Sequence, residues 1–291
     1  AWADAYQRNG LRYYPKLVCS VPFTPASGPR LLAKTPELRA QLVQAALELA
    51  HQPDISSLHL LFPYESQAKE MQAQGMMLRR GVQLHWRNAG YADFDAYLAG
   101  MRRDKRKKIK QERRRVSDAG ITFTHVRGEQ ITPEQWDFFV RCYAHTHAQY
   151  NSPQPLNLAF FQHIGASIPE HILLIIALRD GQPIAGAINF YNHDTLFGRS
   201  WGALEYHPGL HFETCYYQAI DFCIKNKIDL FEGGAQGEHK LARGFLPSVT
   251  WSAHWLAHPQ FAKAVEELLQ REAGGIEQYM DELNDSNPFK H

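Results

Sequence analysis

The chain has 291 residues, with 31 Lys or Arg against 30 Asp or Glu, so its formal net charge at pH 7 is +1. The apolar share of 44% and the charged share of 21% are those of a globular protein and exclude a disordered or fibrous chain. The longest strongly apolar stretch, 171–178, ends at Arg179 and Asp180. Because a membrane-spanning helix needs about 20 apolar residues, none is expected. At about 100–200 residues per domain, the length predicts two domains or one large one.

The predicted elements alternate between strand and helix. The first 90 residues predict a strand over 16–23, a helix over 36–50, a strand over 58–62, a helix over 65–74 and a strand over 82–86. Thr35 is the expected N-cap of the first helix, with Pro36 at its first position. The rest predicts helices over 91–118, 133–148, 158–168, 211–225 and 238–243, and strands over 121–126, 171–179, 184–191, 195–201, 228–231 and 250–256. Asp180-Gly181 predicts a hairpin turn.

Residues 62–75 resemble residues 231–244 at a constant offset of 169, which predicts a duplicated α/β unit. The matches are Phe62/Phe231, Gln67/Gln236, Ala73/Ala242, Gly75/Gly244 and, ten residues on, His85-Trp86/His254-Trp255. The alternative is chance similarity. Since 91–168 has no counterpart in the first copy, we expect a missing N-terminal segment or a degenerate first domain. The expected domains are 1–89 and 120–291, joined by a basic connecting helix over 90–119.

The four cysteines lie far apart or within apolar segments and form no CxxC pair. They are interpreted as buried thiols of a reducing compartment, which predicts a cytoplasmic protein rather than a disulfide framework. The chain begins without an initiator Met or a signal-peptide pattern, as a processed chain or a fragment would. The 15 histidines include close pairs, but none has the spacing of a zinc site, so no metal is expected.

The net charge hides one concentrated cationic segment. Residues 102–115 hold ten Lys or Arg and two acids, a charge of +8, which leaves 1 − 8 = −7 on the rest of the chain. The apolar seam through this segment predicts an amphipathic helix docked by one stripe: Phe94, Leu98, Met101, Ile109 and Val116. Arg106, Lys107 and Lys110 are therefore candidate ligands for tRNA or another polyanion. The alternative is a solvated linker helix.

The segment 231–245, FEGGAQGEHKLARGF, holds the densest chemistry of the chain. A strand ends there, and ligands bind at the carboxyl ends of strands in α/β sheets. Glu232 and His239 are candidate catalytic groups, and Lys240 and Arg243 are candidate donor-binding cations. Three glycines allow close approach of a ligand: Gly233, Gly234 and Gly237. The spacing matches neither a Walker A loop nor a Rossmann fingerprint, so nucleotide hydrolysis and hydride transfer are not expected. The alternative is a glycine-rich turn followed by a charged surface helix.

The preceding segment 205–217, EYHPGLHFETCYY, predicts a turn that opens a helix. Backbone N–H groups near His211 are placed to hold an anion. Glu213 and Tyr217 form an i,i+4 pair, with Tyr216 beside them, and a glutamate base and a tyrosine proton donor suit proton transfer.

Three stretches together resemble the FemAB-like proteins of the GNAT superfamily, which are labelled as peptidoglycan biosynthesis or recognition proteins. They are YYPKLVCSVPFTPASGPRLL (13–32), HFETCYYQAIDFCI (211–224) and FEGGAQGEHKLARGF with SAHWLAHPQF (231–245 and 252–261). The resemblance implies an α/β (α+β) fold of two tandem GNAT-like units, each a mixed bent sheet flanked by helices, with the first incomplete at its N-terminus. GNAT enzymes transfer an acyl group from a thioester to an amine, and the Fem branch uses aminoacyl-tRNA. The loop YHPGLHF lacks the Q/R-x-x-G-x-G/A signature, which argues against coenzyme A.

Two functions are therefore expected from the sequence. The first is an acyl or aminoacyl transferase acting on an amine, for example of a cell-wall precursor. Glu232 or Glu213 would be the base, with His211 or His239 as substitutes, and Tyr216 or Tyr217 would protonate the leaving group. The donor would be a coenzyme A thioester or aminoacyl-tRNA, with no tightly bound cofactor. The second is a non-catalytic module that binds RNA or an anionic cell-wall precursor through the basic helix.

Overall fold

The computed structural model describes residues 2–235 and 237–290. The chain divides into two compact units, which we call the first unit (1–83 and 247–285) and the second unit (84–246 and 286–291). These units do not coincide with the predicted domains 1–89, 90–119 and 120–291. The reason is that the last strand and the last helix belong to the first unit, where the strand pairs with residues 57–61.

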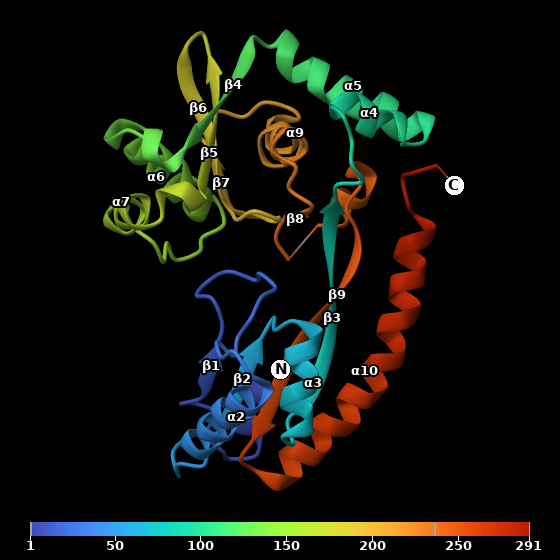
Figure 1. The fold of residues 1–291 in the computed structure, drawn as a ribbon. Helices are drawn as coiled ribbons and strands as arrows, with labels where there is room; N and C mark the ends of the chain where they lie inside the picture. The colour runs from blue at the N-terminus through green and yellow to red at the C-terminus, as the bar shows by residue number, and fades with distance from the viewer. Residues whose placement is uncertain (1, 236, 291) are drawn as a thin grey trace. The chain divides into compact units, whose positions relative to one another are not determined.

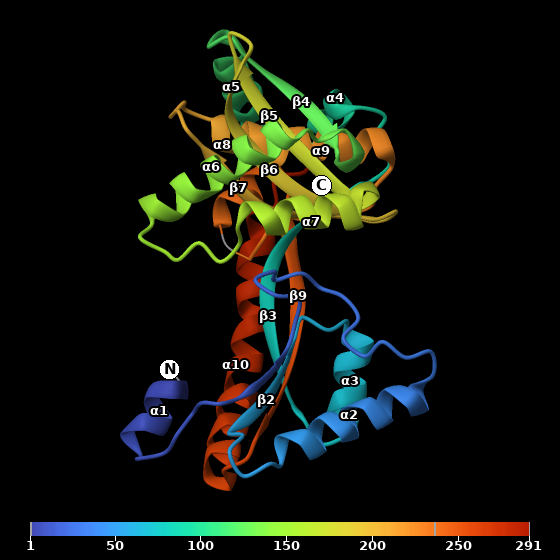
Figure 2. The same ribbon diagram turned by 90° about the vertical axis from the view of Figure 1, so that its left-hand side faces the viewer.

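The first unit combines a small sheet with helices (Figures 1 and 2). Its strand β1 (Leu17–Cys19) pairs in parallel with β2 (Ser57–Leu61), and β2 pairs in the antiparallel sense with β9 (Leu246–Leu256). The helices α2 (Pro36–Ala50) and α3 (Glu65–Ala73) cover one face of β2 (Figure 2). The other helices, α1 (Trp2–Arg8) and α10 (Pro259–Asp285), were not predicted.

The second unit begins in strand β3 (Met77–Arg87) and contains an antiparallel meander of four strands: β4 (Ile121–Arg127), β5 (Ile172–Arg179), β6 (Gln182–Tyr191) and β7 (Thr195–Ala203). The predicted hairpin turn joins β5 to β6, with φ +51° at Asp180 and φ +76° at Gly181. Strand β8 (Leu230–Glu232) then pairs in parallel with β7.

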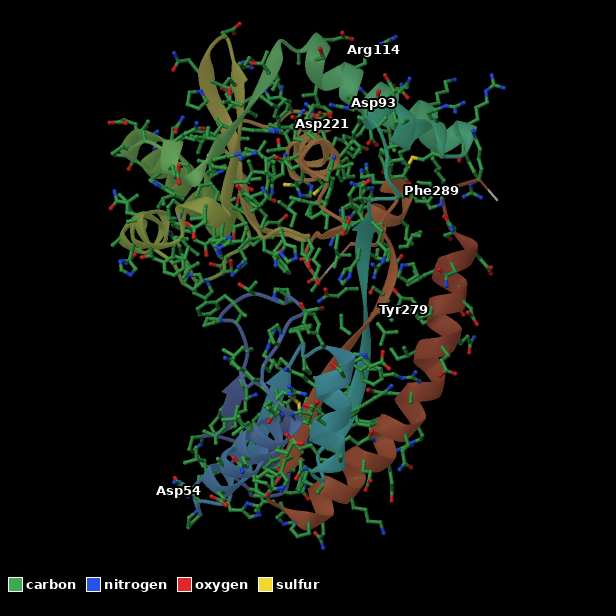
Figure 3. The ribbon with its side chains drawn as sticks, in the orientation of Figure 1. Asp54, Asp93, Arg114, Asp221, Tyr279 and Phe289 are labelled. Atoms are coloured by element: carbon green, nitrogen blue, oxygen red, sulfur yellow. The ribbon has the colours of Figure 1, made fainter. Side chains whose placement is uncertain are left out.

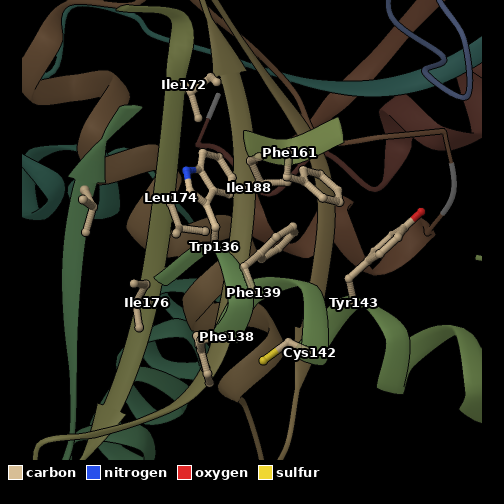
Figure 4. Close-up of a cluster of buried hydrophobic side chains, with 11 residues drawn as sticks. Trp136, Phe138, Phe139, Cys142, Tyr143, Phe161, Ile172, Leu174, Ile176 and Ile188 are labelled. Atoms are coloured by element: carbon tan, nitrogen blue, oxygen red, sulfur yellow. The ribbon is translucent and has the colours of Figure 1, made fainter. Parts of the chain in front are cut away.

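Helices cover both faces of this meander (Figure 1). On one face, α6 (Pro133–Gln149) and α7 (Leu158–Ser167) bury an aromatic and aliphatic core (Figure 4). The opposite face carries one continuous helical stretch, made of α8 (Leu210–Phe212), a π-helical turn η3 (Glu213–Tyr217) and α9 (Gln218–Asn226). Two 3-10 turns lie at Gly128–Gln130 and Pro169–His171. The described residues thus form a mixed nine-stranded sheet flanked by helices, which confirms the predicted fold class.

The basic segment forms two helices instead of the single helix predicted over 91–118. These are α4 (Phe94–Ala99), capped by Asp93, and α5 (Arg103–Asp118), whose Arg114 is labelled in Figure 3. The chain leaves helical geometry between them, where Met101 bridges to Phe289. All five residues of the predicted apolar seam are buried. Because α5 packs within the second unit, it is not a solvated linker.

The order of elements in the two halves agrees with the predicted repeat, but the predicted alignment of one pair of strands, β2 and β8, is wrong. β3 covers 77–87 and β9 covers 246–256, so the two long strands correspond at the predicted offset of 169. His85 on β3 corresponds to His254 on β9, but the residues that pair with these two histidines do not match at the same offset. His254 pairs with His59 on β2, whereas His85 pairs with Glu232 on β8. β2 and β8 therefore correspond at an offset of 232 − 59 = 173, not through Phe62 and Phe231. The expected match at Gln236 lies outside the described residues.

The four cysteines are free thiols: Cys142 and Cys223 are buried, and Cys19 and Cys215 are partly exposed. Burial raises the pKa of Cys142 to about 12, so this thiol is not nucleophilic at neutral pH. No helix within 2–235 or 237–290 is long and apolar enough to cross a membrane.

Candidate active site

The parallel strands β7 and β8 separate soon after they meet. They pair only over residues 195–197 of β7 and 230–232 of β8. Beyond that point β7 continues through 198–203, whereas the segment after β8 turns away at Gly233 and Gly234. Gly234 has φ +85°, a conformation that favours glycine. The separation opens a cavity of about 130 Å³, which we call the wedge pocket. Its polar lining comes from Asn189, Arg199, Ser200, Trp201, His211, Cys215, Tyr216, Gly233 and Gly234.

Tyr216 and His239 form a hydrogen-bonded pair beside this pocket. The Tyr216 hydroxyl lies 3.1 Å from His239 Nε2. Burial raises the pKa of Tyr216, and burial together with Arg243 and Lys240 lowers the pKa of His239. At neutral pH the phenol is therefore protonated and the imidazole neutral, which is the state in which one donates and the other accepts.

Local backbone features position this pair. Tyr216 lies in the π-helical turn η3, an irregularity that is frequent at functional sites because it re-aims side chains within a helix. His239 is the second residue of the 3-10 turn η4 (Glu238–Arg243), which begins directly after Gly237. A Cβ at Gly237 would lie 2.3 Å from the His239 ring, and the φ of Gly237 is +107°. Gly237 therefore makes room for the imidazole, and its role in donor binding stays a prediction.

His211 is shared by the wedge pocket and a neighbouring cavity of about 470 Å³. Burial lowers its pKa to about 4, so its ring is neutral at pH 7. The second cavity also contains Trp201 and the exposed Tyr150 and Tyr206. It lies at the start of the helical stretch, where Gly209 has φ +89°. The two cavities are therefore adjacent, with Trp201 and His211 lining both.

The predicted base Glu213 faces a different cavity. Its carboxylate accepts hydrogen bonds from Arg113 and, at 2.7 Å, from Gln218, and its Arg113 ion pair measures 3.0 Å. Glu213 lines a cavity of about 500 Å³ beside α4 and α5 rather than the wedge pocket. The expected partnership of Glu213 and Tyr217 is therefore wrong, since the Tyr217 hydroxyl donates to Glu112 instead.

Glu232 points to the other face of the sheet from the wedge pocket. Its neighbour Phe231 lines the pocket, and successive residues of a strand face opposite sides. Glu232 is buried opposite His85, whose pKa burial lowers to about 4, and both side chains have interaction partners. The structure therefore does not bring the predicted base Glu232 together with Tyr216.

Lys240 and Arg243 are buried inside the second unit. Lys240 Nζ donates to the Gly234 carbonyl oxygen at 2.7 Å, and burial lowers its pKa to about 8. Arg243 forms a 2.9 Å ion pair with Glu112, stacks on Phe212 with its Cζ 3.4 Å from the ring centroid, and donates to the His239 carbonyl oxygen. Because Lys240 and Arg243 are buried and already bonded within the protein, they are not placed to contact the phosphate of a donor, as was predicted. Both side chains instead brace the loop that carries Gly234 and His239.

The sequence analysis missed Arg199, the only formally charged side chain in the wedge pocket among the described residues. In the β6–β7 ladder, Ile188 faces Ser200 and Asn189 faces Gly198, so Arg199 is the extra residue of a β-bulge. Bulges re-aim side chains and are frequent next to active sites. The signal in the sequence was an arginine within an otherwise apolar strand.

The outer face of α5 remains strongly basic. Lys107 and Lys110 are exposed and Arg106 is partly exposed, and Lys110 lies 3.1 Å from Asp95. The other exposed cations of this helix are Arg103, Lys108, Arg114 and Arg115. Within the part of the chain that the structure describes, no group of three His, Cys, Asp or Glu side chains is arranged to hold a metal ion.

The meander, the diverging parallel pair and the pocket between them define a GNAT-type fold. Solved structures share this architecture at low sequence identity. The C-terminal domain of a protein titled as a putative lysylphosphatidylglycerol synthetase from Agrobacterium fabrum has TM-score 0.60 and 12% identity, covering 81% of this chain and 78% of that one. L-PGS from Bacillus licheniformis has TM-score 0.57 and 10% identity, with coverages of 80% and 79%. FemX has TM-score 0.55 and 10% identity, with coverages of 85% and 85%.

The sequence also matches a family over residues 1–291, described as FemAB-like, peptidoglycan biosynthesis/recognition. The chain belongs to this FemAB-like family, and the resemblance to FemAB-like proteins of the GNAT superfamily is confirmed. No curated protein matches the sequence.

Proposed function

We propose that the protein transfers an acyl or aminoacyl group to an amine, with the reaction taking place in the wedge pocket. The observation that carries the proposal is the Tyr216 hydroxyl, 3.1 Å from a neutral His239, where the parallel strands separate. The membership in a family of peptidoglycan biosynthesis/recognition supports an amine of a cell-wall precursor as acceptor. No serine or cysteine nucleophile is required, because the amine attacks the acyl carbon directly.

In this mechanism the amine nitrogen first bonds to the acyl carbon to give a tetrahedral adduct, and the bond from that carbon to the donor's oxygen or sulfur then breaks as the carbonyl re-forms. Tyr216 gives its phenolic proton to the departing atom. His239 accepts the proton that the attacking nitrogen loses and returns it to Tyr216, so the pair ends as it began. Gly233 and Gly234 line the pocket, and their backbone N–H groups are proposed to stabilise the oxyanion of the tetrahedral adduct.

The acyl donor is proposed to be aminoacyl-tRNA rather than a coenzyme A thioester. A large polyanion fits the basic outer face of α5, where most Lys and Arg side chains are exposed. The cavity beside the wedge pocket contains Glu205 and three histidines but no Lys or Arg. That composition offers little to a pyrophosphate, which supports the argument from the missing GNAT signature.

The test measures aminoacyl transfer from a pool of charged tRNA to a peptidoglycan-precursor pentapeptide, with acetyl-coenzyme A as the alternative donor. Tyr216→Phe and His239→Gln should each lower kcat by about 10²-fold or more, since positioned proton transfer contributes about 10²–10⁴-fold. Tyr14→Phe is the matched control, because Tyr14 is 63% exposed and belongs to the first unit, whereas the wedge pocket is lined by residues of the second. Full activity in both pair variants would overturn the assignment of the proton-transfer pair.

The second candidate is a non-catalytic module that binds RNA or an anionic precursor through α5. It is favoured by the exposed cations of that helix, and it predicts polyanion binding without turnover. Replacing Lys107, Lys108 and Arg114 by Glu should abolish tRNA binding measured at low salt. In wild type the logarithm of the affinity should fall linearly with the logarithm of the salt concentration. Unchanged binding in the reversed variant would exclude α5 as the binding surface.

A further inference from the structure

Arg199 has a structural setting that the proposed chemistry leaves unexplained. The β-bulge removes it from the ladder between β6 and β7 and places it at the wedge pocket. The side chain is partly buried, and burial lowers its pKa. Among the described residues, Arg199 forms no ion pair with a carboxylate, and the one titratable group that acts on its pKa is the uncharged Tyr143. A partly buried cation without a counter-ion lowers stability unless a ligand supplies one.

The rest of the pocket does not neutralise this charge. Within residues 2–235 and 237–290, the lining contains no Asp or Glu, and its other polar side chains include Asn189, Ser200, His211 and Tyr216. His211 and Tyr216 are uncharged at pH 7, because burial lowers the pKa of the first and raises that of the second. The pocket therefore carries a formal charge of +1, in contrast to the neighbouring cavity, which contains Glu205.

We propose that Arg199 binds a compact oxyanion, a carboxylate or a single phosphate group, that belongs to the substrate and lies next to the reacting carbonyl. The inference rests on the proposed function, because the wedge pocket is the same site. A guanidinium presents a planar fork of N–H donors that matches the two oxygens of such a group. The hydroxyl of Ser200 and the amide of Asn189 lie in the same pocket and can complete its hydrogen bonds.

The size of the pocket limits the anion. Its volume of about 130 Å³ is small beside the neighbouring cavity of about 470 Å³. The small volume favours a compact group, such as one carboxylate or one phosphate, over a larger polyanion. The oxyanion has two possible sources, a carboxylate of the amine acceptor or a phosphate of the donor, and Arg199 is suited to either. In both cases Arg199 is a binding residue that determines specificity and takes no part in proton transfer.

The first test needs no turnover. Thermal unfolding of the full chain is measured in acetate, inorganic phosphate and chloride at matched ionic strength, for wild type, Arg199→Met and Arg199→Lys. An anion at about ten times its Kd should raise the wild-type Tm by about 3 °C over chloride, and this rise should disappear in Arg199→Met. In chloride, Arg199→Met should be at least as stable as wild type, because an unpaired charge has been removed.

A control separates this effect from general anion binding to basic surfaces. Arg114→Met removes an exposed arginine of α5 and should keep the full response to both anions. An anion response equal in wild type and Arg199→Met, or no response in wild type, overturns the proposal. So does a loss of stability in Arg199→Met in chloride, since that would show a structural role.

The second test identifies the source of the oxyanion in the transfer assay. Arg199→Lys keeps the charge and loses the fork, so KM for the substrate that carries the oxyanion should rise about tenfold with kcat changed far less. A rise confined to the acceptor identifies a carboxylate, and a rise confined to the donor identifies a phosphate. An unchanged KM for both substrates overturns the proposal. Because the anion response is independent of Tyr216, it can persist even if Tyr216→Phe keeps full activity and the transferase proposal fails.

Discussion

Both units contain a pair of parallel strands, and only the pair in the second unit opens into a pocket. In the second unit, β7 and β8 part after three paired residues each, and the wedge pocket lies between them. In the first unit, β1 and β2 also pair over three residues, 17–19 with 58–60. There the segment after β1 comes back to the segment after β2, where Gly28 forms a parallel bridge to Pro63.

Specific hydrogen bonds hold this closure in the first unit. The Gly28 N–H donates to the Phe62 carbonyl oxygen at 3.0 Å. The Gln67 side-chain oxygen accepts from the backbone N–H groups of Arg30 and Leu31 at 2.7 and 3.1 Å. The duplicated frame therefore has one copy in which the parallel strands are bridged again and one in which they stay apart around the wedge pocket. A shared fold does not imply a shared function, because the chemistry depends on what fills the gap.

The buried pairs on the two long strands differ in the same way. His254 on β9 hydrogen-bonds His59 on β2, with their Nδ1 atoms 2.8 Å apart, and Ser57 and Ser252 bond the outer ring nitrogens. The corresponding pair in the second unit is His85 opposite Glu232. The first unit thus encloses a neutral, fully bonded pair, whereas the second places a carboxylate at the same point. Each prediction below alters one side of this comparison.

The largest effect is expected when the polar frame behind the open pocket is broken. Glu112 accepts hydrogen bonds from both Arg243 and Tyr217, and Arg243 is 3% exposed. Glu112→Ala leaves this guanidinium buried without its counter-ion, which should lower the free energy of unfolding by about 3–5 kcal/mol. Urea denaturation measures the loss. The control Glu129→Ala removes an exposed carboxylate and should change it by less than about 0.5 kcal/mol. An equal, small effect in both variants would contradict the structural role of Glu112.

The next largest effect concerns pH and the buried histidines of both units. Burial lowers the pKa of His59 and His85 to about 4 and that of His254 to about 3. Because the unfolded chain binds their protons at about pH 6.5, stability should be fully present above that pH and fall as the pH drops toward 4.

Substitution separates the contribution of the histidine pair in the first unit. His254→Gln should reduce the slope of unfolding free energy against pH by about 1 kcal/mol per pH unit between pH 6 and 4.5. Urea denaturation across this range measures the slope. His193→Gln is the control, since the His193 side chain is 87% exposed and should leave the slope unchanged. A slope unaffected by His254→Gln would show that this ring is already protonated in the folded state.

A smaller effect is expected when the hydrogen bonds that hold segment 28–31 against the first unit are removed. Gln67→Ala removes the acceptor for Arg30 and Leu31 and a donor to the Leu31 carbonyl oxygen, which should cost about 1–3 kcal/mol. Hydrogen exchange over 28–31 should accelerate, because the bonds that pin this segment are gone. Gln44→Ala is the matched control, since Gln44 is exposed and its side chain donates to Gln74 at the surface. Unchanged exchange in Gln67→Ala would mean that the closure depends on other contacts.

The sequence predicted the frame better than the site for a physical reason. Periodicity and capping depend on near neighbours, so α2 was predicted with its correct bounds, and its cap, in which Thr35 accepts from the Leu38 N–H, is confirmed. The location of the wedge pocket depends on where two strands distant in sequence cease to pair, and no local pattern encodes that point. Glu213 and Arg243 were natural candidates by residue type, yet their roles depend on partners about a hundred residues away. Arg199 was missed because a β-bulge depends on the register of a neighbouring strand.

The smallest effect on stability is expected when a methyl group is added at Gly233, in the lining of the wedge pocket. A Cβ at Gly233 would lie 3.0 Å from Phe245 and 3.4 Å from Tyr216, so Gly233→Ala forces these rings to give way by a few tenths of an ångström. Unfolding free energy should fall by about 1 kcal/mol. Transfer activity should fall about tenfold, because a small displacement of Tyr216 disturbs its alignment with the leaving group. Gly274→Ala in α10 is the matched control: its new Cβ meets nothing within 4 Å, so stability should rise slightly with activity unchanged. If Gly233→Ala keeps full activity, Tyr216 does not need its present position, and the open wedge is not where transfer takes place.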